Sequence, residues 1–190
     1  MRMRYIAPLI LGPLLATPRI AAAHVLGPEA GIVAGLVHPL TGPDHLLMLL
    51  AAGFYAQRLG HGVRWRVPLG VMCALLGGAL AGALGGPAAT LEPLVWASAA
   101  VMTWMGVRAP VLDWRRGASF AGAVGLLHGY VHGGELHFHH GLAGFLTGML
   151  ASSALLLAFG MALAAAPPVR EIQAKLASLL GRVHVAGDRA

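Results

Sequence analysis

Charged residues are scarce in this chain. They make up 11% of its 190 residues, whereas hydrophobic residues make up 57%. In soluble domains about a quarter of the residues are charged, so an ordinary soluble domain is excluded. The arginines stand in short clusters between apolar runs, which is typical of topology signals in membrane proteins. The formal net charge of +6 therefore indicates no nucleic-acid partner.

Cysteine is almost absent, and two common catalytic patterns are missing. The single Cys73 excludes an internal disulfide framework and a CxxC metal site. Without a glycine-rich phosphate loop the chain does not itself use ATP, and without HExxH it lacks the base of a zinc protease. Histidine and carboxylate side chains remain as the candidate ligands.

Long apolar runs dominate instead. About 20 mostly apolar residues cross the hydrocarbon layer of a bilayer. Five stretches approach or meet this: residues 31–55, 67–86, 91–107, 119–134 and 142–166. They predict an all-α, polytopic membrane bundle of about five transmembrane helices. Small residues spaced four apart predict tight helix packing in lipid; they are Gly78, Gly82 and Gly86, Gly77, Ala81 and Gly85, and Gly144 and Gly148.

The N-terminus has the layout of a cleavable signal peptide. A basic start at Arg2 and Arg4 precedes an apolar segment, residues 5–15, and three alanines at 21–23. Residues 1–23 would be removed, leaving a bundle of residues 24–166 and a tail of residues 167–190. An uncleaved first span is the alternative. After cleavage, the amine and imidazole of His24 would form a chelating pair, unless His24 merely follows the cleavage site.

Basic and non-basic gaps alternate along the chain. Arginines occupy the gaps near residues 58–66 and 108–116 and the tail, whereas residues 85–90 and 136–140 carry no Lys or Arg. The positive-inside rule then predicts a bacterial inner-membrane protein with a periplasmic mature N-terminus and a cytoplasmic C-terminus. The alternation of basic and non-basic gaps requires that residues 31–55 cross the membrane once. Residues 169–185 predict an amphipathic helix at the cytoplasmic interface.

Three candidate metal ligands lie within the first stretch: His38, Asp44 and His45. Ionisable groups cost on the order of 2.5–3.5 kcal/mol each at the centre of a spanning helix, so they indicate function. Imidazoles with a carboxylate suit Ni, Zn, Cu or Fe(II). The alternative is a structural kink with a buried His–Asp hydrogen bond.

The segment HPLTGPDH contains two prolines and a glycine, which predict that the first transmembrane helix is broken there. We expect a half-helix ending near Val37, an unwound turn, and a new helix from Pro43, with Thr41 as its cap. Asp44 would then lie at the positive end of the new helix dipole. Transporters use such breaks as ion sites.

A second group, His128, His132 and Glu135, is spaced four and three residues apart, which places the three on one helical face. These three residues lie at the end of their apolar run, which we expect near the outer mouth of the bundle. His137, His139 and His140 follow as a capture patch or a nonessential scavenger loop. Glu92, at the start of a middle span, is interpreted as a supporting carboxylate, a proton carrier or a solvated loop residue.

The string HPLTGPDHLLMLLAAG resembles the signature HPxxGxDHxxxMxxxG of the HupE/UreJ family of hydrogenase and urease accessory membrane proteins, except that Met48 stands one residue earlier than in the signature. The string HGYVHGGE resembles the second motif of that family. The resemblance covers essentially the whole chain. It implies a nickel permease, with cobalt for some members. It also implies roles for His38, Asp44 and His45 in the first motif, and for His132 and Glu135 in the second.

The leading hypothesis is therefore a secondary transporter for Ni²⁺ or Co²⁺, without enzyme activity, supplying urease or hydrogenase maturation proteins. The residues argue for a transition metal within the lipid bilayer, and nickel comes from the resemblance. One alternative is a membrane-bound metalloenzyme similar to di-iron hydroxylases, because HGYVH and HFHH cluster histidines. Another is an accessory protein that delivers metal without transporting it.

Cleavage of the signal is directly testable. Edman sequencing of the protein purified from membranes should begin at His24, because the three alanines supply the small residues that signal peptidase requires. A mature chain that begins at Met1 would establish the uncleaved first span instead.

Overall fold

The computed structural model describes residues 31–60, 62–85, 89–108, 113–136, 141–175 and 178. Within these ranges the chain is helical without strands, as predicted. The helices are α2 (Ile32–Thr41), α3 (Pro43–Arg58), α4 (Arg66–Gly85), α5 (Glu92–Val107), α6 (Trp114–Leu136) and α7 (Leu142–Ala165), with a short 3-10 turn at Ala89–Leu91. Residues 167–175 are helical after a bend, which covers part of the predicted tail helix. The predicted signal peptide lies outside the described residues.

The predicted break is present but is one residue long. α2 continues to Thr41, so the expected end near Val37 is wrong, and Gly42 alone separates it from α3. The longer helix is stabilised because the Thr41 hydroxyl donates to the carbonyl oxygens of Val37 and His38. The Gly42 amide also donates to the His38 carbonyl. Thr41 therefore ends α2 instead of capping α3, whose N-cap is Gly42.

α6 begins one turn earlier than the predicted stretch of residues 119–134. The cause is Asp113, whose carboxylate accepts hydrogen bonds from the backbone amides of Arg115 and Arg116. A carboxylate that accepts such bonds stabilises a helix start. An aspartate directly before Trp114 was the sequence signal for this boundary.

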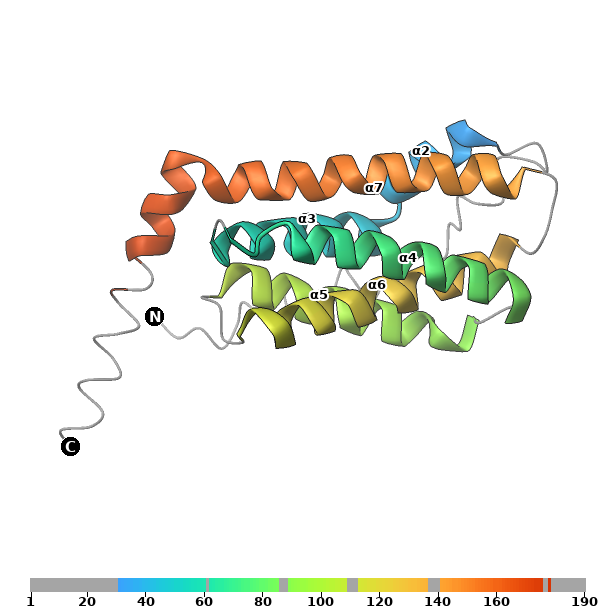
Figure 1. Cartoon of the computed structure of the whole chain (residues 1–190), viewed down its shortest axis with the longest axis horizontal. Helices are drawn as coiled ribbons and strands as arrows, with labels where there is room; N and C mark the ends of the chain where they lie inside the picture. The colour runs from blue at the N-terminus through green and yellow to red at the C-terminus, as the bar shows by residue number, and fades with distance from the viewer. Residues whose placement is uncertain are drawn as a thin grey trace, which may run out of the picture.

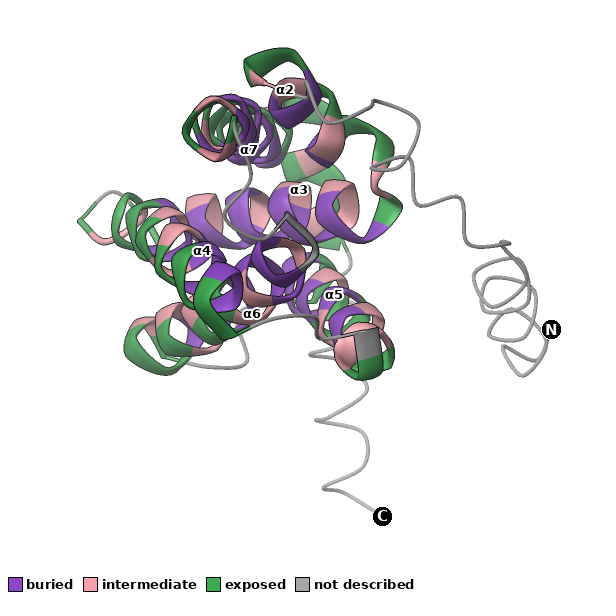
Figure 2. Cartoon of the chain, turned by 90° about the vertical axis from the view of Figure 1, so that its right-hand side faces the viewer, coloured by how far each residue is buried: buried purple, intermediate pink, exposed green. Residues whose placement is uncertain are grey.

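The helices form a bundle around α3 (Figure 1). α7 packs on α2 and α3, α5 packs on α3, and α4 pairs with α6. Seen from its end, the bundle has buried surfaces directed inward and exposed surfaces outward (Figure 2). The core gathers around fully buried side chains such as Met48, Leu75, Met102 and Met149. These methionines pack within the apolar core.

Glycines bring α4 and α6 into backbone contact. A Cβ on Gly78 would overlap the Leu126 carbonyl, and one on Gly82 would overlap the Tyr130 carbonyl. The contact advances four residues along both helices, so α4 and α6 run parallel. In the other direction, Gly129 and Gly133 meet the backbone of α4 in the same way. Close approach through small residues is the usual basis of helix association in lipid.

The glycines of α7 form a second contact of this kind. Gly148 lies against the backbone of Ile32 in α2, and Gly160 lies against that of Leu50 in α3. α7 therefore follows α2 and α3 in succession. By contrast, Gly77 and Ala81 of the second predicted row are exposed on the outer side of α4, and only Gly85 of that row lies against α6, next to the Tyr130 hydroxyl.

One end of the bundle is basic. The Arg58 guanidinium donates to three carbonyl oxygens at the end of α5, including that of Gly106 at 2.8 Å. The Arg66 guanidinium lies 4.6 Å from the centre of the Trp114 ring. The C-terminal end of α5 and the N-terminal ends of α4 and α6 thus share this end.

The outward faces carry large apolar side chains. Among the described helices, α4 and α7 are long and apolar enough to cross a membrane. Exposed apolar residues extend along both; they include Leu69, Leu80, Leu84, Leu155, Phe159 and Leu163. Such broad exposed apolar surfaces mark contact with lipid or protein.

The contact between α4 and α6 can be tested with two glycines of α4. Gly82→Ala would force a Cβ into the Tyr130 backbone and should destabilise the bundle by about 1–3 kcal/mol, as overpacking does. Gly77→Ala is the control, since nothing lies within 4 Å of its added Cβ. Thermal unfolding in detergent should show a lower midpoint for Gly82→Ala alone. Equal midpoints would contradict the close contact.

Candidate metal site

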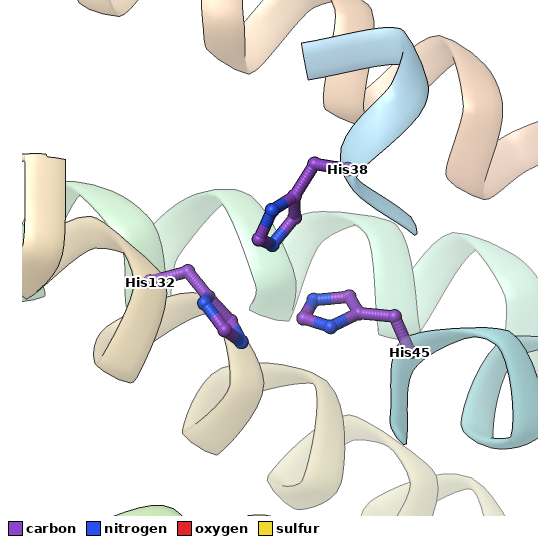
Figure 3. Close-up of side chains that lie close together, drawn as sticks. All are labelled: His38, His45 and His132. Carbon is purple, nitrogen blue, oxygen red and sulfur yellow. The ribbon is translucent and has the colours of Figure 1, made fainter. Parts of the chain in front are cut away.

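Three imidazoles from separate helices meet inside the bundle (Figure 3). His38 comes from the last turn of α2, His45 from the first turn of α3, and His132 from α6. Their ring centroids are 4.5–5.0 Å apart. The two sequence groups, about 90 residues apart, are therefore brought together in one cluster.

Asp44 lies beside these rings. Its Oδ2 atom is 3.1 Å from His45 Nδ1, 3.7 Å from His132 Nε2 and 3.9 Å from His128 Nε2. The carboxylate is almost completely buried. A buried carboxylate among imidazoles supplies the negative charge that would offset a bound cation.

Hydrogen bonds fix which nitrogen of two histidines faces the cluster. His128 Nδ1–H donates to the Val124 carbonyl at 2.9 Å, because a carbonyl oxygen only accepts. His45 Nδ1–H donates in the same way to the ionised Asp44 carboxylate. Each imidazole therefore presents an unprotonated Nε2, the form that binds metals.

The His45 Nε2 atom is fully buried and has no hydrogen-bond partner among the described residues. The Nε2 of His128 is likewise buried and without a hydrogen-bond partner among the described residues, since it lies 3.9 Å from the Asp44 Oδ2. Buried acceptors without a donor carry a cost of about 1–3 kcal/mol each. A cation placed between them would remove this cost, so the donor set fits a positively charged ligand.

The spacing also fits one metal ion. Nitrogen atoms of His38, His45 and His132 all lie within 4.8 Å of one another. With metal–nitrogen bonds of about 2.0–2.1 Å, two ligands of one ion lie at most about 4.2 Å apart. Because three ligands cannot all lie opposite one another, their mean separation around one ion is at most about 3.6 Å, so the rings would have to close by up to about 1.2 Å. Within the described ranges, no second group of this kind occurs.

The cluster lies away from the basic end. His128 is about 12 Å from the C-terminal end of α6 and about 21 Å from its start, at a rise of 1.5 Å per residue. Phe145 of α7 packs on the His38 ring with 5.4 Å between centroids. His45 and His128 are fully buried, whereas the His132 side chain is 15% exposed.

Of the remaining predicted ligands, Glu92 has a described side chain. Glu92 is the first residue of α5 and is half-buried, and it does not join the metal-ligand group of the described chain. Glu135 lies in the last turn of α6, with its side chain outside the described part. His24, His137, His139 and His140 lie outside the described residues.

Two supporting contacts were not expected from the sequence. Val124 orients His128 through a backbone carbonyl, which any residue type supplies, so no sequence signal existed. Phe145 lies more than 100 residues from His38, and only the packing of α7 on α2 brings the rings together.

Known proteins share sequence with this chain over most of its length. The model of the family described as HupE / UreJ protein matches residues 12–187. The chain is 34% identical over 150 residues to Protein HupE of Rhizobium leguminosarum bv. viciae, covering 79% of this chain and 78% of that protein. No solved structure matches. With its apolar outer faces the chain is a helical membrane protein, and it belongs to the HupE/UreJ family.

Proposed function

We propose that this chain is a secondary transporter that carries nickel, or alternatively cobalt, across the bacterial inner membrane. The observation that carries the proposal is the convergence of His38, His45 and His132 around buried Asp44 inside an apolar bundle. Buried ionisable groups at membrane depth are costly and are found where ions or protons pass. The break at Gly42 is the kind of interruption on which transporters build such sites.

The proposed topology has five crossings after a cleaved signal peptide. α2 and α3 together would cross once, because α7 follows both in succession and α4 runs parallel to α6. With the arginine-rich end in the cytoplasm, the metal cluster lies in the periplasmic half. An ion arriving from outside would meet the cluster first and leave towards the basic end.

The residues have distinct proposed roles. His38, His45, His128 and His132 supply nitrogen ligands, and Asp44 holds the His45 tautomer while balancing the charge of the ion. Glu135, one turn after His132, would add a carboxylate at the outer side. Imidazole sites do not by themselves select nickel over copper or zinc, so the choice of nickel rests on the family. The family also supports delivery to hydrogenase or urease maturation proteins.

Substitution of the orienting carboxylate tests the site. Asp44→Asn keeps the shape but removes the charge, and loss of such a partner typically costs 10–100-fold in metal affinity. We expect a decrease of about that size in nickel binding by the purified protein and a matching loss of radioactive nickel uptake by cells. His45→Ala should abolish both.

Asp113→Asn is the matched control. Asp113 is exposed at the basic end, and asparagine caps a helix about as well as aspartate does. It should bind and transport like the wild type. Unchanged uptake in Asp44→Asn and His45→Ala would exclude this site, whereas wild-type binding without uptake would favour metal delivery.

Uptake should depend on external pH. Ligand nitrogens must be unprotonated to bind a metal, so protons compete with the ion. Imidazoles in water titrate near pH 6.5, so initial uptake rates at subsaturating nickel should fall as the external pH decreases from about 7.5 to about 5.5. The decrease should shrink at saturating nickel, because the metal then displaces the protons. A rate that rises steadily over this range would contradict ligand competition.

A further inference from the structure

One buried hydroxyl of the described bundle makes no hydrogen bond within it. Five polar residues of the described chain are classed as buried: Asp44, His45, His128, Ser152 and Ser153. The first three form the metal cluster. Ser152 donates to carbonyl oxygens of its own helix, including that of Gly148 at 3.1 Å. Ser153 is fully buried, and its Oγ finds no hydrogen-bond partner among the described residues.

This is unusual for a hydroxyl in a helix. Serine and threonine side chains in helices commonly bond to a carbonyl three or four residues earlier. Ser98, Thr103 and Thr147 do so here, at 2.7–2.8 Å. An unsatisfied buried hydroxyl costs about 1–3 kcal/mol relative to a satisfied one. Alanine at residue 153 would avoid this cost, so packing alone gives no reason for serine.

Ser153 lies on α7 level with the junction of α2 and α3, further towards the basic end than Phe145. It is two turns along α7 from Phe145, which packs on His38, or about 12 Å at 1.5 Å per residue. Met149, one turn before it, lies against Gly35 of α2, and Leu157, one turn after it, lies against Gly53 of α3. The helix α7 therefore carries Ser153 past the junction of α2 and α3.

The surrounding interior offers an ion little else. Met48, Leu49, Ala52, Met149 and Leu157 belong to one apolar core cluster. Further on, the buried Tyr55 hydroxyl packs on Gly117 near the start of α6. A divalent cation that moves from the histidines to the basic end would cross this apolar region, where each lost ligand is costly.

We infer that Ser153 Oγ is a transient ligand for the divalent cation on its way from the histidine cluster to the cytoplasmic end, an inference that rests on the proposed transport function. A hydroxyl oxygen has two lone pairs and no charge. It would bind the ion more weakly than the imidazoles and the carboxylate do, and conduction requires intermediate positions that the ion can leave again. Ser153 would thus speed transfer without setting the affinity of the main site.

The test compares two adjacent serines in full-length protein reconstituted into liposomes. Ser153→Ala should reduce the maximal rate of nickel uptake by about tenfold, which corresponds to about 1.4 kcal/mol, while equilibrium nickel binding stays within about twofold. Ser152→Ala is the control and should transport like the wild type, because its hydroxyl bonds only to its own helix. Ser153→Cys keeps a donor atom of similar size and should retain more flux than Ser153→Ala.

Each other outcome is decisive. Wild-type flux in Ser153→Ala would overturn the inference. A lower thermal midpoint for Ser153→Ala would make the hydroxyl structural, and equal losses of binding and flux would place it in the main site; both overturn it. If wild-type protein binds nickel but carries none into liposomes, the transport proposal itself fails, an outcome distinct from failure of Ser153 alone in an active transporter.

Discussion

Backbone contact between parallel helices is the constraint on which the rest of this bundle depends. In lipid, apolar side chains give little drive for association, so helices must approach closely through small residues. The segment HGYVHG of α6 makes two such backbone contacts. Gly129 and Gly133 lie against α4, and His128 and His132, each one residue earlier, are turned about 100° to face the cluster. The four-residue spacing thus places both glycines against α4 and directs both histidines toward the metal cluster.

Burial of the polar cluster is stable because its members compensate one another. The Asp44 carboxylate accepts from His45, and the Val124 carbonyl accepts from His128. Edge-to-face ring contacts join His38 to His45 and to Phe145, an arrangement that aromatic rings favour. The Nε2 atoms of His45 and His128 have no hydrogen-bond partner among the described residues, so their lone pairs are available to a cation.

Much of this architecture was predictable from local sequence, and the failures have physical causes. Apolar runs located the helices, and the two prolines with Gly42 located the break, because both signals act within a few residues. The predicted end of α2 was wrong because the Thr41 hydroxyl donates to carbonyl oxygens of α2. This bonding competes with capping of the start of α3. The sequence placed His38 and His132 in two separate groups of candidate ligands. Their convergence, the contact of Phe145 with His38 and the unpartnered hydroxyl of Ser153 arise from tertiary packing, which has no local sequence pattern.

The histidines of the cluster are buried to different extents, so one side of the cluster is more accessible than the other. The His132 side chain is 15% exposed, whereas those of His45 and His128 are fully buried. In the proposed function, an ion from solution would therefore lose its hydration shell in steps, binding the nitrogen of His132 before the deeper ones. Stepwise desolvation would have a lower barrier than desolvation in one event. A large chelator in the medium would reach only the His132 side, so it would remove an arriving ion but not one already bound by His45.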